Sequence, residues 1–259
     1  MFINRALLIL LVSLSVVLGP QNVAAKDYPI GSVFNDIIEF RFPGTRVKVP
    51  LPLGDWKLLS ISTFGTSGSN AVIRSHWLIR HNKTLVTGLM SIRVPVDSPT
   101  SHWIISRDCS EKMKRRAWYF HEDSYEKHEN CNVLYPTWGL RSTAKGWQKA
   151  FGYITRSGLT MPNGFVGGRF TRSDSKEYLR IGIWLPPEHY GFQRERKYYL
   201  PSNSPWNINN IESFPKKKAF MEKARLWANS WRSLVDWGFK NKLRKEEVRA
   251  HPKIDGSNN

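Results

Sequence analysis

Two arginines in the stretch 162–187 have the residue type and the spacing to bind an anion. This stretch, PNGFVGGRFTRSDSKEYLRIGIWLPP, holds two β-rich runs on either side of the polar loop SDSK. Folded as a hairpin about that loop, it places Arg169 opposite Arg180, with Tyr178 and Trp184 nearby. Two planar guanidinium groups suit phosphate or carboxylate, and neighbouring aromatic rings can stack on a base or a sugar. The sequence therefore predicts an anion-binding surface formed by these four side chains.

The same two arginines also have a structural interpretation. Like charges that face each other across a strand pair destabilise a sheet, so the pair needs a compensating partner. Each guanidinium can stack on Tyr178, Trp184 or Phe165, or can pair with an internal carboxylate. The alternative is an external anion. A double substitution to alanine separates the two interpretations, since it unfolds the chain in the first case and removes salt-dependent binding in the second.

Cys109 and Cys131 are the two cysteines of the chain. An even pair in an exported protein predicts one disulfide, which would stabilise the fold by roughly 3 kcal/mol in the chain-entropy model. A pair of metal thiolates is the rival interpretation, but the CxxC spacing of such sites is missing. We therefore predict a Cys109–Cys131 bond.

The segment between the cysteines begins basic and ends acidic. Its acidic half contains His121 and His128, and histidine with carboxylates is ligand chemistry for a metal such as zinc. The spacing does not match the helical HExxH arrangement. We interpret the segment as a solvated loop held by its disulfide, and we predict no metal and no cofactor.

No catalytic motif is found in the sequence. GTSGS, from Gly65 to Ser69, resembles a GxSxG nucleophile elbow but ends in serine, so it is interpreted as a turn. The sequence therefore favours a non-catalytic binding protein. The alternative is a hydrolase or transferase whose site forms only in the fold. A deep pocket that collects carboxylates with histidines would favour it, the candidate histidines being His76, His102, His121 and His189.

The N-terminal segment predicts the localisation of the protein, and the net charge predicts its class of binding partner. Residues 1–25 combine Arg5, an apolar run and a final Val-Ala-Ala, which predicts a cleaved secretory signal and an exported chain, periplasmic or extracellular. The alternative is a signal that is retained as an uncleaved anchor. Removing them removes one arginine and no acid, so the formal charge falls from +18 to +17. Such a charge suggests a polyanionic neighbour, namely an acidic envelope polymer or anionic lipid head groups, with nucleic acid a less favoured choice. The alternative is that the charge serves solubility alone, and a protein partner is a further hypothesis. No segment of the mature chain is long and apolar enough to span a membrane.

The elements that must position these residues follow from hydrophobic periodicity. Residues 55–64, 71–80 and 85–96 predict three successive antiparallel strands, and 178–185 alternates with Leu179, Ile181, Ile183 and Leu185 on one face. Residues 142–156 and 215–240 predict helices, the second with a tryptophan-rich stripe. The predicted fold class is α+β, an antiparallel β-sheet with two main amphipathic helices packed on one face. Residues 26–254 form one domain in this interpretation, and 255–259 a disordered tail.

Overall fold

The computed structural model describes residues 28–42, 45–65, 71–97, 103, 107–125, 128–138, 144–175, 177–194 and 201–254. The predicted signal segment 1–25, the predicted tail 255–259 and His102 lie outside the described residues. So does most of the GTSGS turn.

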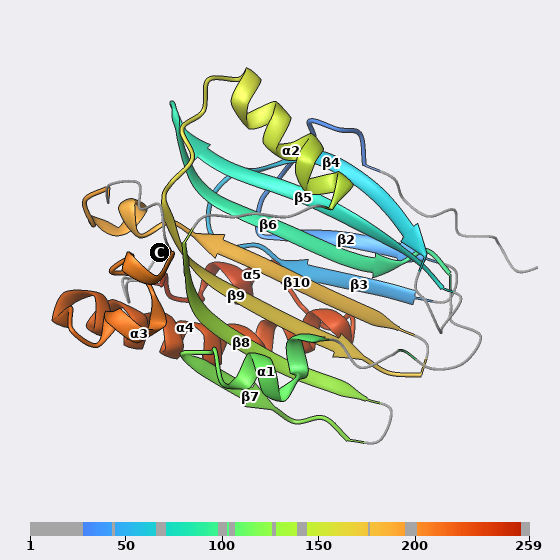
Figure 1. The fold of residues 1–259 in the computed structure, drawn as a ribbon. Helices are drawn as coiled ribbons and strands as arrows, with labels where there is room; N and C mark the ends of the chain where they lie inside the picture. The colour runs from blue at the N-terminus through green and yellow to red at the C-terminus, as the bar shows by residue number, and fades with distance from the viewer. Residues whose placement is uncertain are drawn as a thin grey trace, which may run out of the picture.

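The described chain is built on one large antiparallel sheet of eight strands (Figure 1). Their spatial order is β1-β4-β5-β6-β10-β9-β8-β7, so the fold is α+β as predicted. The strands are β1 (Val33–Phe34), β4 (Trp56–Gly65), β5 (Val72–Asn82), β6 (Leu85–Pro95), β7 (Tyr119–Glu122), β8 (Glu129–Trp138), β9 (Gly164–Ser173) and β10 (Tyr178–Leu185). A separate two-stranded hairpin consists of β2 (Ile37–Phe42) and β3 (Thr45–Pro50).

Both faces of the sheet are buried over its centre. On β10, the side chains of Ile181 and Ile183 enter the main core, whereas Trp184 enters a second core with Trp77. The period-two pattern that predicted this strand is therefore confirmed, but its second face is aromatic and covered.

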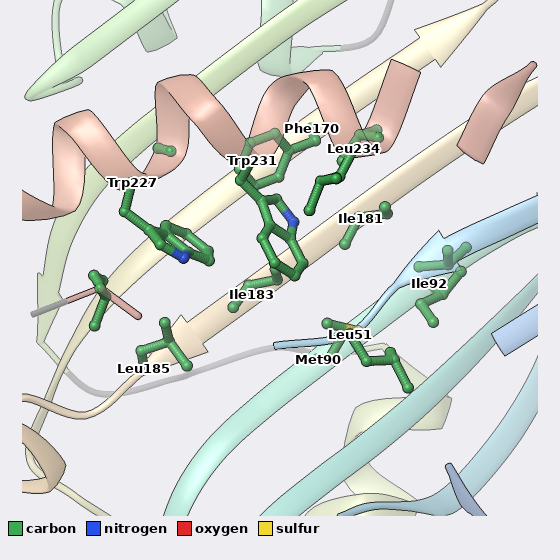
Figure 2. Packing of buried hydrophobic residues seen from close by; sticks show 14 of the residues in the cluster. Leu51, Met90, Ile92, Phe170, Ile181, Ile183, Leu185, Trp227, Trp231 and Leu234 are labelled. Atoms are coloured by element: carbon green, nitrogen blue, oxygen red, sulfur yellow. The ribbon is translucent and has the colours of Figure 1, made fainter. Parts of the chain in front are cut away.

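The helical elements lie between and after the strands. They are η1 (Arg107–Cys109), α1 (Glu111–Lys114), α2 (Lys145–Arg156), η2 (Pro187–Tyr190), η3 (Pro201–Asn203), α3 (Ile208–Ile211), α4 (Pro215–Phe239) and α5 (Lys245–Arg249). The predicted stripe of α4 is buried, and Figure 2 shows Trp227 and Trp231 projecting from α4 toward the strand that carries Ile183. Gly238 lets α4 approach β3 closely, because a Cβ there would lie 2.0 Å from the carbonyl oxygen of Lys48. No helix in the described part of the chain has both the length and the apolar character needed to cross a membrane.

The two long helices pack on opposite faces of the sheet, so the prediction of a shared face is wrong. Helix α4 and the β2–β3 hairpin cover the face of Ile181, whereas Trp147 and Ile154 of α2 pack with Trp77 and Trp184 on the other (Figure 1). The physical reason is that the second face of β5 and β10 also carries large apolar side chains. These need a cover of their own.

The register of the β9–β10 hairpin also differs from the prediction, by two residues. Ser173 pairs with Tyr178, and Arg172 pairs with Leu179 rather than with Glu177. Hydrogen bonds between Asp174 and Glu177 close the turn, with the Glu177 amide donating to the Asp174 carboxylate at 2.7 Å. Because side chains alternate with a period of two, this shift leaves every residue on its predicted face.

Candidate anion-binding cleft

Arg169 and Arg180 lie on one face of the sheet but do not oppose each other. Arg180 pairs across the strands with Thr171 of β9 and with Arg93 of β6, and the partner of Arg169 is Gly182. The predicted Arg169–Arg180 pair is therefore a diagonal neighbour pair on this face. This correction follows directly from the two-residue shift in register.

A single buried carboxylate joins the two arginines. Nη1 of Arg169 donates a hydrogen bond to Oδ1 of Asp108 at 2.6 Å. Arg180 donates two hydrogen bonds to the same carboxylate, one from Nε to Oδ2 and one from Nη2 to Oδ1 at 2.9 Å. Asp108 is only 1% exposed. Burial opposes its ionisation, but the two guanidinium groups outweigh that effect and hold the pKa of the Asp108 carboxyl below its usual value. Because one anion faces two cations, the triad remains cationic.

The disulfide holds Asp108 in place. Cys109, the next residue in η1, is bonded to Cys131 of β8 with a Cα–Cα distance of 5.7 Å, which confirms the predicted bond. Ser110 then caps the short helix α1, accepting a hydrogen bond from the Met113 amide. The covalent link and the ion pairs together fix η1 and α1 against β8 and β9.

This arrangement places three arginines around one cleft of about 470 Å³. Arg115 and Arg116 reach it from the end of α1, and Arg169 reaches it from β9. Tyr135, Pro136 and Thr137 of β8 also line the cleft. The rest of this lining comes from the segment around the start of α3, namely Trp206, Asn207, Ile208 and Asn209. No described Asp or Glu side chain lines the cleft.

Arg169 is held in a fixed position at this cleft. Its guanidinium lies over the ring of Tyr135, 5.1 Å from the ring centre, and its side chain is 27% exposed. Nη1 is occupied by Asp108, while Nε and Nη2 donate to no group among the described residues. Glycine at position 167 leaves room for the supporting ring, because a Cβ there would lie 2.9 Å from Tyr135. A guanidinium with one side clamped and the other side open is suited to an incoming oxyanion.

The other residues of the predicted surface lie elsewhere. Tyr178 is buried against Trp103 at 5.2 Å, and burial raises its pKa to about 12. Trp184 stacks on Trp77 at 5.6 Å in the core beneath α2. Arg180 is committed to Asp108. Of the four predicted residues, only Arg169 lines the cleft, and binding at the remaining three stays a prediction.

Sequence reasoning missed Arg115 and Arg116 as functional candidates. They belong to the basic half of the segment between the cysteines, which was interpreted as a solvated loop. The signal was the disulfide itself, since a 22-residue separation closed onto β8 must bring that basic half close to the sheet.

The described histidines do not assemble the pocket that would favour an enzyme. His76 is buried against Phe40, and Nε2 of His121 contacts the guanidinium of Arg232. His189 lines a separate cavity of about 100 Å³ together with His251 and Arg80, and no Asp or Glu side chain is among the described residues that line it.

A metal centre also finds little support among the described residues. The one His, Cys, Asp or Glu group compact enough to hold an ion consists of Cys109, Glu129 and Cys131. Its two sulfur atoms are bonded to each other, so neither is a thiolate ligand.

Comparison with known proteins leaves the cleft as the main indication of function. No protein-family model matches the chain, and no curated protein matches its sequence. The cleft offers three guanidinium groups, an aromatic support and neutral amides. Such a set can bind and orient an anion, but it contains no general acid or base that works near neutral pH.

Proposed function

We propose that this protein binds an anionic group of an acidic envelope polymer in the cleft of Arg115, Arg116 and Arg169, without catalysing a reaction on it. The observation that carries the proposal is that three arginines line one cleft whose described lining contains no carboxylate. Guanidinium forks bind phosphate and carboxylate through charge-assisted hydrogen bonds.

The net charge supports the same function. At a formal +18 for the whole chain, long-range attraction raises the local concentration of polyanions and speeds their encounter with the protein. Diffuse attraction alone does not select a site, whereas the clamped Arg169 provides a fixed one.

We also propose that the protein acts outside the cytoplasm. The n-region, apolar run and Val-Ala-Ala of residues 1–25 support export. The Cys109–Cys131 disulfide supports it independently, because such bonds persist in oxidising compartments.

The test is binding of lipopolysaccharide and of single-stranded DNA to the chain from Lys26 onward, across a series of salt concentrations. The variant Arg115→Ala/Arg116→Ala removes two exposed charges that line the cleft. Lys112→Ala/Lys114→Ala is the matched control, since it removes the same amount of positive charge from the adjacent helix α1, outside the lining. We expect affinity to fall as the salt concentration rises. The slope of the logarithm of the binding constant against the logarithm of the salt concentration should become shallower by roughly one to two in the arginine variant. The lysine variant should change this slope little.

Two results would contradict the proposal. Equal losses in the two variants would mean that binding depends only on diffuse charge. Preference for DNA over lipopolysaccharide at every salt concentration would point to nucleic acid as the partner.

Arg169→Ala is a useful third variant, because Arg180 remains to pair with Asp108.

A further inference from the structure

The lining of the cleft combines two kinds of polar group. Arg115, Arg116 and Arg169 supply its positive charges, and Thr137, Asn207 and Asn209 add neutral hydroxyl and amide groups. The Asn209 backbone amide donates to Oδ1 of Asn207 at 2.9 Å, which fixes the segment, while the Asn209 side chain itself is exposed and makes no hydrogen bond to another described group. A ligand that met both kinds of group would carry a negative charge and a neutral, hydrogen-bonding body.

The aromatic groups of the cleft argue against a nucleotide as that body. A base would need an open aromatic face on which to stack. The ring of Tyr135 is covered by the Arg169 guanidinium. Trp206 is only 2% exposed, and Lys217 lies 5.3 Å from its ring centre. The described lining therefore offers amide and hydroxyl groups to a ligand and little stacking surface.

From this we infer that the anion is carried by a sugar: the cleft recognises a phosphorylated or carboxylated saccharide unit, with the anionic group on the arginines and sugar hydroxyls on the amide of Asn209. This inference rests on the proposed function and adds the ligand class to it. Hydroxyl groups are both donors and acceptors, as is a side-chain amide, so the two match without a further charge. The cleft, at about 470 Å³, falls in the size range of small-molecule sites.

The experiment is a titration of the chain from Lys26 onward with four probes, followed by NMR chemical shifts: inorganic phosphate, glucose 6-phosphate, glucuronate and adenosine 5′-monophosphate. We expect glucose 6-phosphate to bind at least about fivefold more tightly than phosphate, the effect of one hydrogen bond of ordinary strength. Asn209→Ala should remove that gain and leave the phosphate affinity unchanged. Asn203→Ala, an exposed asparagine outside the lining, should change neither. Comparing glucuronate with glucose 6-phosphate shows whether a carboxylate can take the place of the phosphate as the anionic group of the ligand.

The outcomes distinguish a failure of the saccharide inference from a failure of the proposed anion binding. If glucose 6-phosphate binds no better than phosphate, or if Asn209→Ala leaves its affinity intact, the saccharide inference is wrong and anion binding stands. Tighter binding of adenosine 5′-monophosphate than of glucose 6-phosphate would also overturn the inference. If none of the four probes shifts the resonances of Arg169 and its neighbours, the proposed function itself fails.

Discussion

Arg93 of β6 and Arg180 of β10 lie directly opposite each other across the strands, a like-charge pair in the middle of the large sheet. Arg180 pairs with Asp108, whereas the guanidinium of Arg93 lies over the ring of Phe64, 5.3 Å from its centre. Burial, and then the charge of Arg180, lowers the pKa of Arg93 to about 10. The relationship shows why Asp108 is needed at this point of the sheet, and it leads to the first two predictions.

Asp108→Asn should destabilise the fold strongly, since it leaves two guanidinium groups facing a neutral amide. We expect a loss of roughly 3–5 kcal/mol, the usual cost of breaking a buried ion pair by removing one partner. The pH dependence has a definite sign. Because the folded pKa of Asp108 is lowered, its contribution is complete above the unfolded pKa of about 4 and is lost as the pH falls through the folded value. Urea unfolding between pH 2 and pH 7 should show this acid-dependent loss in the wild type and a weaker one in the variant. If the free energy of unfolding fell with decreasing pH as steeply in the variant as in the wild type, the assigned role of Asp108 would be contradicted.

Arg93 and Arg180 should differ sharply when each is replaced by glutamine. Arg180→Gln takes a partner from Asp108 and should cost roughly 3 kcal/mol. Arg93→Gln should stay within about 1 kcal/mol of the wild type, because the relieved repulsion and the lost contact with Phe64 are of similar size. Thermal unfolding at pH 7 measures both. Equal losses would mean that Arg93 has a structural role like that of Arg180.

Cys109→Ser should affect stability and binding together. Loss of the disulfide should lower the free energy of unfolding by roughly 2–4 kcal/mol. The same change frees η1, so Asp108 and the arginines that follow α1 lose their fixed position, and lipopolysaccharide affinity should fall with it. Ellman titration of the native wild type should find no free thiol. Retained affinity in the folded variant would show that the disulfide does not position the cleft.

Trp231→Ala should be far more costly than Trp237→Ala on the same helix. Trp231 is 2% exposed and packs in the main core with Trp227, so its truncation should cost roughly 3–5 kcal/mol. Trp237 is 42% exposed and is the matched control, with an expected loss below about 1 kcal/mol. Denaturant unfolding of both variants checks the contrast. A small loss for Trp231→Ala would mean that α4 does not depend on its tryptophan stripe.

The exported protein should begin at Lys26. The basis is the Val-Ala-Ala that closes the apolar run of residues 1–25. N-terminal sequencing of material recovered from outside the cytoplasm measures this directly. An exported form that retains Met1 would contradict cleavage, and its absence from exported fractions would contradict the localisation.

The sequence by itself determined the features that depend on local periodicity and on composition. The alternation of β10, the tryptophan stripe of α4 and the Cys109–Cys131 pairing were all predictable, because each follows from a repeat or from a residue type with one available partner. It also predicted that Arg169 and Arg180 share a face and that an internal carboxylate could hold them. The hairpin register escaped prediction, because a shift of two residues changes the cross-strand pairs but leaves the same side chains on the core face.

Only the tertiary structure decided which carboxylate holds Arg169 and Arg180 and which residues lie beside it. Asp108 is 61 residues from Arg169 and 72 from Arg180, and no periodic pattern links positions so far apart. The face chosen by α2 and the approach of Arg115 to Arg169 depend likewise on how separate elements pack. Local patterns specify strands and helices, whereas a site assembled from several elements depends on contacts between segments distant in sequence. For that reason the cleft could be identified only once the chain was folded.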